Sequence, residues 1–257
     1  MFNDEYEVKN ELYAGDISFI GSMYNEKHNL YDRLCGVNDY TKGYLDAIMK
    51  VQRSIYGYFF LEDMLKGDVL DEMMRVCPVK PNEDGVETVQ YVYANYFLAR
   101  RMATDERTDI LSRVGRELGR ENKINLYTPD ASVRFINVNN KGTVDYYNEM
   151  PYVFRNSRIN LNITLRSIKS GIPLRCMDIC GAGGFLLSNY QADLYDVFVP
   201  GEDMVIYDSI DDLMNKCKYY LSHDAERRQI AQNGFGKIEE KHTYDVRFEE
   251  IFNRVFN

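Results

Sequence analysis

Short apolar runs alternate with longer amphipathic stretches over the second half of the chain. The runs predict buried strands, and the stretches between them repeat apolar residues every three or four positions, as helices do. Strands that alternate with helices form a parallel sheet with helices on both faces, so we expect an α/β, Rossmann-like fold. The predicted strands are residues 17–21, 124–128, 133–138, 159–163, 185–187 and 205–207. The predicted helices are residues 150–155, 173–180, 191–198, 209–221, 225–234 and 243–256.

A long helical region separates the first predicted strand from the second. Residues 40–75 and 86–102 have helical periodicity, and a polar break rich in proline and glycine divides them. A further helix is predicted over residues 104–118, with Thr104 as its cap and Gly119 as its terminator. We expect residues 35–119 to form a helical insertion after the first strand. The main Rossmann-like part then covers residues 120–257, and residues 1–257 form a single domain.

The composition excludes several classes of protein. Hydrophobic residues make up 45% of the chain and charged residues 28%, which is typical of a folded globular protein. The formal net charge of −9 argues against general nucleic-acid binding. No apolar run approaches the roughly 20 residues of a membrane-spanning helix. The first residues, MFNDEYEVKNELYAGD, are acidic and polar and do not resemble a signal peptide, so we expect a cytoplasmic protein.

The five cysteines do not form a disulfide or metal-binding pattern. Cys176 and Cys180 lie four residues apart in an apolar helical stretch, with no further cysteine or histidine close by in sequence. We therefore expect reduced core thiols and no metal site. The three histidines are widely scattered and form no recognisable catalytic motif.

The glycine-rich segment Gly181-Ala-Gly-Gly184 resembles a dinucleotide-binding loop in composition only. That fingerprint follows a strand and precedes a helix, whereas here a helix precedes the glycines and a strand follows them. The reversed order argues against a nicotinamide-dependent oxidoreductase. Two interpretations remain open: a helix-to-strand turn that needs positive φ, or a close approach of the backbone to a ligand.

A second candidate phosphate site follows the first predicted strand. Gly21 and Ser22 lie where an α/β sheet binds ligands, and the start of the next helix offers free amides. Lys27 and Arg33 are placed to add positive charge, although an exposed helix face explains them equally well.

The order of several weak motifs is more specific than any one of them. The motifs are Asn156–Ile163, Ser170–Asp178, Gly183–Leu187, Gly201–Tyr207, Asp211–Leu213, Arg227–Ala231, Asn233–Gly234 and His242–Tyr244. In this order they resemble the C-terminal donor-binding domain of GT-B glycosyltransferases, in particular the CgeB/YkvP-like spore-maturation family. The strands at 16–22 and 124–128 are similar to the opening strands of that domain.

The resemblance implies a site for a nucleotide-sugar. It places the Gly21 turn beside the diphosphate, the strand end at Tyr127 and Thr128 beside the base, and the helix start at Arg175 to Asp178 beside the ribose and phosphates. Arg175 would stabilise the leaving diphosphate, without a metal or another cofactor. The family usually has Glu where this chain has the shorter Asp178. The candidate contacts are Gly21, Ser22, Lys27, Tyr127, Thr128, Arg175, Asp178, Gly183 and Gly184.

The expected activity is transfer of a sugar from a nucleotide-sugar to an unknown acceptor, which is a glycan, a protein or a small molecule. GT-B enzymes also have an N-terminal acceptor domain, and the short segment before the first strand is too small for one. We therefore expect the acceptor half on a separate polypeptide or a longer chain. The alternative is a non-catalytic module that binds a nucleotide-sugar or docks onto a partner through residues 40–102.

Overall fold

The computed structural model describes residues 9–25, 29–83 and 85–256. The chain divides into two compact units. The sheet unit comprises Met1–Gly21, Leu111–Ile163 and Gly171–Asn257, and the helical unit comprises Ser22–Ile110 and Thr164–Ser170. The helical unit therefore begins directly after the first strand. It also includes Thr164–Ser170, which lie outside the predicted insertion in sequence.

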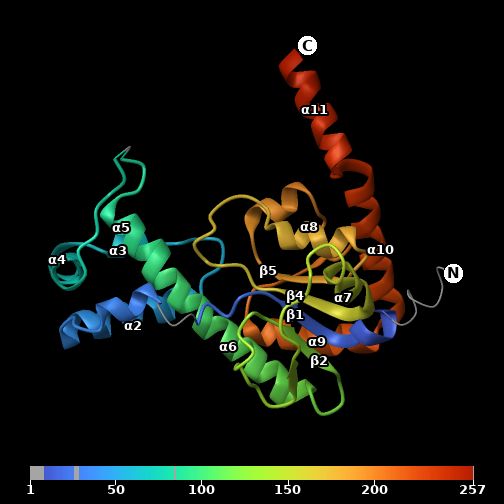
Figure 1. The fold of residues 1–257 in the computed structure, drawn as a ribbon, viewed down its shortest axis with the longest axis horizontal. Coiled ribbons are helices and arrows are strands. Elements are labelled where there is room, and N and C mark those ends of the chain that lie inside the picture. The colour runs from blue at the N-terminus through green and yellow to red at the C-terminus, as the bar shows by residue number, and fades with distance from the viewer. Residues whose placement is uncertain (1–8, 26–28, 84, 257) are drawn as a thin grey trace. The chain divides into compact units, whose positions relative to one another are not determined.

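The sheet unit is built on a six-stranded sheet in which every strand pairs in parallel (Figure 1). Its order, β3-β2-β1-β4-β5-β6, is the Rossmann order. The α/β, Rossmann-like prediction is confirmed. The strands are β1 (Gly15–Ile20), β2 (Ile124–Tyr127), β3 (Val138–Asn140), β4 (Ser157–Asn162), β5 (Leu186–Asn189) and β6 (Val205–Tyr207).

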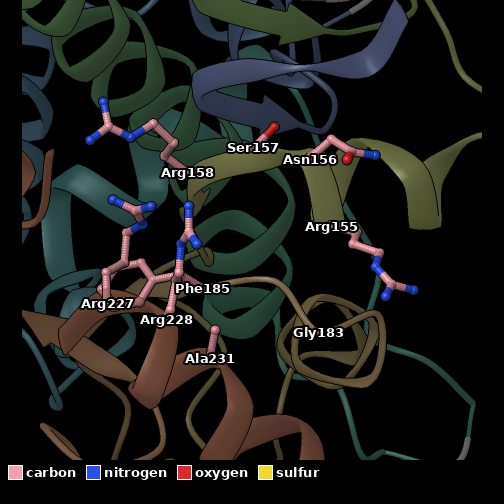
Figure 2. Close-up of a pocket in the computed structure, with 9 residues that line it drawn as sticks. All are labelled: Arg155, Asn156, Ser157, Arg158, Gly183, Phe185, Arg227, Arg228 and Ala231. Carbon is pink, nitrogen blue, oxygen red and sulfur yellow. The ribbon is translucent and has the colours of Figure 1, made fainter. Parts of the chain in front are cut away.

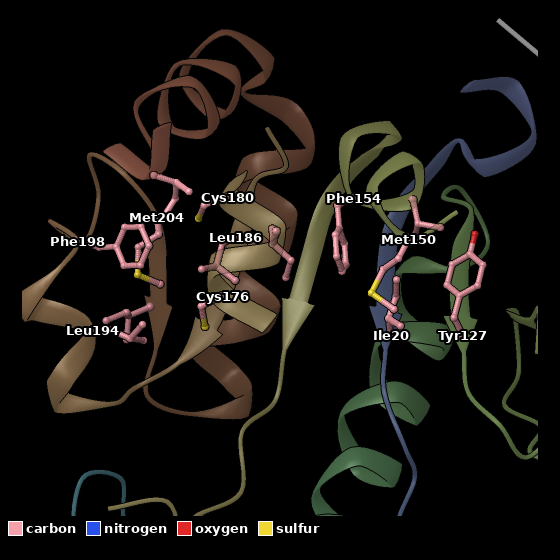
Figure 3. Packing of buried hydrophobic residues seen from close by; sticks show 14 of the residues in the cluster. Ile20, Tyr127, Met150, Phe154, Cys176, Cys180, Leu186, Leu194, Phe198 and Met204 are labelled. Atoms are coloured by element: carbon pink, nitrogen blue, oxygen red, sulfur yellow. The ribbon is translucent and has the colours of Figure 1, made fainter. Parts of the chain in front are cut away.

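Helices cover both faces of this sheet. One face carries α7 (Met150–Asn156), α8 (Leu174–Gly181) and α10 (Asp224–Lys241), whose apolar side chains join those of the strands in one cluster (Figure 3). Over the other face, α9 (Ile210–Ser222) lies beside the end of α6 (Ala99–Leu118). Two ion pairs join these helices, Arg113 with Asp211 at 2.5 Å and Lys218 with Glu117 at 3.1 Å. Most residues of β1, β2, β4, β5 and β6 are therefore buried, and their apolar side chains pack beneath the helices.

One polar side chain joins the central strands. Asn160, on β4, accepts a hydrogen bond from the Ser18 hydroxyl of β1 at 2.7 Å. Its amide group donates to the carbonyl oxygens of Phe154 at 2.9 Å and Phe185 at 3.3 Å. Asn160 is 1% exposed, so these bonds satisfy a side chain that burial would otherwise destabilise.

The third predicted strand is displaced. Residues 133–137 form a loop, in which Phe135 makes an isolated bridge to Val138, and Asn137 has a φ of 56°. The strand itself is Val138–Asn140, which overlaps the predicted strand only at Val138. The backbone of this loop lies against α6, where a Cβ on Gly115 would come within 2.2 Å of the Ile136 carbonyl oxygen. Close packing against a helical glycine has overridden the local strand preference.

The helical unit has its own core. Its buried side chains include Leu45, Leu61, Met73, Tyr93 and Leu98, all 0% exposed. The helical periodicity predicted over residues 40–75 corresponds to three separate helices. The elements are η1 (Leu30–Leu34), α2 (Asp39–Arg53), α3 (Leu61–Met64), α4 (Gly67–Val76), α5 (Val89–Val92), the π-helical η2 (Tyr93–Leu98) and the first half of α6.

Thr104 lies inside α6 and does not begin a new helix. Its hydroxyl donates to the carbonyl oxygens of Tyr24 at 2.8 Å and Arg100 at 3.2 Å. A threonine hydroxyl can bond to the carbonyl four residues earlier as readily as it can cap a free amide, and here the continuous helix favours the first arrangement. The predicted cap is therefore wrong, whereas the predicted end at Leu118 is confirmed.

A buried ion pair lies in the helical unit. The Arg166 guanidinium bonds to Glu106 at 2.6 Å, both side chains are 4% exposed, and Arg166 stacks on the Tyr56 ring. Burial raises the pKa of Glu106, and the positive charge of Arg166 opposes that rise. Removal of either partner would leave an isolated buried charge.

The remaining helices are η3 (Ala192–Asp196) and α11 (Tyr244–Phe256). No helix among the described residues is long and apolar enough to cross a membrane.

We predict opposite effects for two glycines of α10. A Cβ on Gly234 would come within 2.5 Å of the Asp203 carbonyl oxygen, whereas a Cβ on Gly236 would meet nothing within 4 Å. Gly234→Ala should lower the free energy of unfolding by about 1–3 kcal/mol. Gly236→Ala should raise it by about 0.5–1 kcal/mol, because alanine favours the helix. Urea denaturation of the two variants measures both effects, and equal effects would contradict the packing described.

Candidate functional site

The sheet order places a topological switch point between β1 and β4, and α/β sheets commonly bind ligands at such points. The chain continues from β1 toward β2 on one side and from β4 toward β5 on the other, so this is the topological switch point. Parallel strands bring all their carboxyl ends to one edge, called here the carboxyl edge. Gly21 and Thr128 lie there, and the Gly21 amide donates to the Tyr127 carbonyl oxygen at 3.0 Å. The structure thus brings three of the predicted site residues together.

The amino terminus of α8 also lies at this edge, because α8 follows β4 and precedes β5. Gly171, with a φ of 87°, turns the chain, and Pro173 precedes the first helical residue. No side chain caps this end of the helix. Uncapped amides and the helix dipole make such a terminus favourable for an anion.

Arg175 and Asp178 project from the first turns of α8 and contact each other at 3.5 Å. The second oxygen of Asp178 accepts a hydrogen bond from the Tyr146 hydroxyl at 2.8 Å. The Arg175 guanidinium lies 5.4 Å from the centre of the Phe154 ring and contacts the Met150 sulfur. Burial lowers the pKa of Arg175, but a guanidinium keeps its charge at neutral pH. The carboxylate is thus held by two partners, and the cation is half-buried beside it.

The end of β2 presents buried groups. Tyr127 is 3% exposed, and burial raises its pKa to about 12, so its phenol stays neutral. Thr128 is 1% exposed, and its hydroxyl has no hydrogen-bond partner among the described residues.

The structure places Ser22 in the helical unit, where its hydroxyl accepts a hydrogen bond from the Tyr24 amide at 2.9 Å. Its carbonyl oxygen accepts a hydrogen bond from Arg107. Lys27 lies outside the described residues.

Gly183 and Gly184 do not lie at the carboxyl edge. They precede β5, so the parallel sheet places them at the opposite, amino edge. Gly183 has a φ of 77°, as the turn interpretation requires. A Cβ on Gly184 would come within 2.7 Å of the Phe154 carbonyl oxygen and 2.8 Å of the Asn160 amide nitrogen. We therefore remove both glycines from the predicted donor site.

Two features of the sheet unit were missed by the sequence analysis. Tyr146 was not singled out, since its loop has no motif that would mark a partner for Asp178. A cavity of about 320 Å³ at the amino edge has four arginines in its lining, of which only Arg155 lay outside the quoted motifs, and no motif indicated that they would gather there (Figure 2). These arginines are Arg155, Arg158, Arg227 and Arg228.

The strand order and the parallel sheet define a Rossmann-like domain with a topological switch point between β1 and β4. A family model described as "Glycosyl transferase-like" matches residues 100–253, which is more than half of the chain. The chain therefore belongs to this glycosyl transferase-like family.

Among solved structures, the crystal structure of TarM is similar to this chain, with 16% sequence identity and a TM-score of 0.46. The match covers 57% of this chain and 32% of the TarM chain, so the chain spans about a third of that protein's length. No significantly similar sequence was found among the curated proteins.

The cysteines differ in exposure and in pKa. All five are free; Cys176, Cys180 and Cys217 are buried, Cys77 is half-buried, and Cys35 is exposed. The prediction of core thiols thus holds for three of the five. Burial raises the pKa of Cys176 and of Cys217 to about 12 and also raises that of Cys180.

We predict selective alkylation of the native protein at pH 8. The thiolate is the reactive form, and a raised pKa removes it, so the three buried cysteines should react only after denaturation. Cys35 should be labelled first and Cys77 more slowly. Mass spectrometry of iodoacetamide-treated protein measures this order, and early labelling of Cys176 would contradict the packing of α8 on the sheet.

Proposed function

We propose that this chain is the donor-binding part of a GT-B glycosyltransferase of the CgeB/YkvP-like type, which transfers a sugar from a nucleotide-sugar. The observation that carries the proposal is the position of Arg175 and Asp178 on the first turns of α8, beside the switch point of the sheet. A cation and an uncapped helix amino terminus can bind the phosphates of a nucleoside diphosphate, and a carboxylate can bind its ribose. Helix α8 carries all three of these groups.

In this proposal the diphosphate binds at the amino terminus of α8, beside the Gly21 turn. Arg175 and the helix dipole stabilise the negative charge that develops when the bond between the sugar and the diphosphate breaks. This arrangement requires no metal, because protein groups supply the positive charge. The base lies at the end of β2, near Tyr127 and Thr128.

Asp178 is proposed to accept hydrogen bonds from the ribose hydroxyls. Its Oδ1 atom already accepts the Tyr146 hydroxyl. A bound ribose would share or replace that hydrogen bond. Tyr146 therefore competes with the nucleotide for the carboxylate of Asp178.

The acceptor is proposed to bind to polypeptide outside these 257 residues. The described residues contain one parallel sheet, whereas a GT-B enzyme places its donor between two. Acceptor specificity and the base that activates the acceptor then belong to that second part.

A non-catalytic nucleotide-sugar-binding module is the second candidate. It is favoured by the contacts of Asp178 within the chain, because Arg175 and Tyr146 already bind its two carboxylate oxygens. The two candidates differ in turnover: calorimetry with UDP- and GDP-sugars measures binding, and a donor-hydrolysis assay measures the reaction. Binding without turnover in the presence of the acceptor half would favour the module, and no nucleotide binding would reject both.

We predict that Arg175→Ala weakens nucleotide-diphosphate binding by about 1–3 kcal/mol, because a charge-assisted hydrogen bond to phosphate is lost. Arg120→Ala is the matched control, since Arg120 is an exposed arginine at the end of α6. Isothermal titration calorimetry measures both variants. Unchanged affinity in Arg175→Ala, or an equal loss in the control, would remove Arg175 from the site.

We further predict opposite effects at the carboxylate. Asp178→Ala should weaken nucleotide binding, because ribose loses its acceptor. Tyr146→Phe should leave binding unchanged or strengthen it, because the competing hydroxyl is gone. The same titration measures both, and weaker binding in Tyr146→Phe would show that the tyrosine supports the site instead of competing with it.

A further inference from the structure

The cavity at the amino edge is assigned no role by the donor-binding proposal. It lies on the sheet unit alone, between the end of α7, the start of β4, the Gly183 turn and the first turns of α10. Figure 2 shows the guanidinium ends of Arg158, Arg227 and Arg228 on one side of the cavity. A concentration of arginines is unusual on a chain whose net charge is −9.

The arginines are only partly neutralised. Arg158 bonds to Asp16 at 3.2 Å and to Asp224 at 2.6 Å, and Arg227 also bonds to Asp224. Among Arg158, Arg227 and Arg228, two described carboxylates thus pair with two of the three guanidinium groups. Arg228 is exposed and makes no ion pair with a described carboxylate. The cavity therefore carries excess positive charge.

The Gly183 turn leaves space beside these arginines. A Cβ on Gly183 would meet nothing within 4 Å, so the backbone here borders open space. Gly183 has the positive φ that the turn interpretation requires, and the same residue lines the cavity.

A second cavity, of about 260 Å³, continues along α10. It shares Arg155, Gly183, Arg228 and Ala231 with the first, and its own lining includes Ala182 and Phe235. Arg228, Ala231 and Phe235 lie on one face of the helix, at spacings of three and four residues. Phe235 is 38% exposed, so one part of this surface is cationic and the other is apolar.

We propose that these adjoining cavities bind an organic phosphate. The phosphate group lies against Arg228 and its neighbouring arginines, because a guanidinium pairs with phosphate oxygens through two parallel hydrogen bonds. The apolar or aromatic part of the ligand packs on Phe235. The site is separate from the proposed donor site, because the two lie at opposite edges of the same sheet.

The test uses calorimetric titration of the 257-residue protein with two probes, phenyl phosphate and inorganic phosphate. The first offers both chemical parts of the proposed ligand and the second only the charge. We expect phenyl phosphate to bind more tightly. Arg228→Ala should lower the binding affinity for both probes about tenfold. Phe235→Ala should weaken phenyl phosphate about threefold and leave inorganic phosphate unchanged.

Two control variants make the result specific. Arg120→Ala removes the same charge elsewhere on the surface and should not change the binding of either probe. Arg175→Ala alters the proposed donor site and reports any probe that binds there instead. Thermal denaturation checks that the Arg228 and Phe235 variants remain folded, which their exposure favours.

Three results would overturn the proposal: no binding of phenyl phosphate at millimolar concentration, an equal loss in Arg120→Ala, or equal weakening of both probes by Phe235→Ala. Loss in Arg175→Ala with no loss in Arg228→Ala would place the probe at the carboxyl edge and would also overturn it. Failure of the donor proposal leaves these outcomes unaffected, since they use no nucleotide-sugar.

Discussion

The buried side chain of Asn160 links the central strands of the sheet by hydrogen bonds. Both candidate sites are built at the ends of these strands. The hydrogen bonds of Asn160 link β1, the end of α7 and the residue before β5. They fit only because Gly184 has no Cβ, which would come within 2.8 Å of the amide nitrogen. A buried amide without these partners would be costly, so this contact specifies the pairing of β4 with its neighbours.

The parallel sheet gives its two edges different chemistry. At the carboxyl edge, the switch point places the Gly21 turn near an uncapped helix terminus with Arg175 and Asp178. At the amino edge, side chains from α7, β4 and α10 gather positive charge around Gly183. Residues that are near one another in sequence, such as Arg175 and Gly183, thereby lie at opposite ends of one short helix and at opposite edges of the sheet.

Periodicity predicted most of the elements because the buried strands contain short apolar runs and the crossover helices are amphipathic. Val205–Tyr207 is found with its predicted bounds. The prediction failed where a tertiary contact overrode the local pattern. Residues 133–137 became a loop against α6, and α10 continues past Gly234 because Gly234 allows the helix to pack closely on Asp203. For the site, motif order indicated Gly21, Arg175 and Asp178, but no local signal indicated Tyr146.

By itself, the sequence determined the α/β class, the helical region after the first strand and the reversed order around the glycines, because each depends on local periodicity or on residue order. Only the tertiary structure decided which edge each loop occupies, since strand direction and pairing are long-range properties. In the structure Gly183 and Gly184 lie at the edge opposite to Gly21, Asp178 accepts a hydrogen bond from Tyr146, and four arginines line one cavity. The direction of each strand decides which residues meet at an edge of a parallel sheet, and the spacing of residues in the sequence does not indicate that direction.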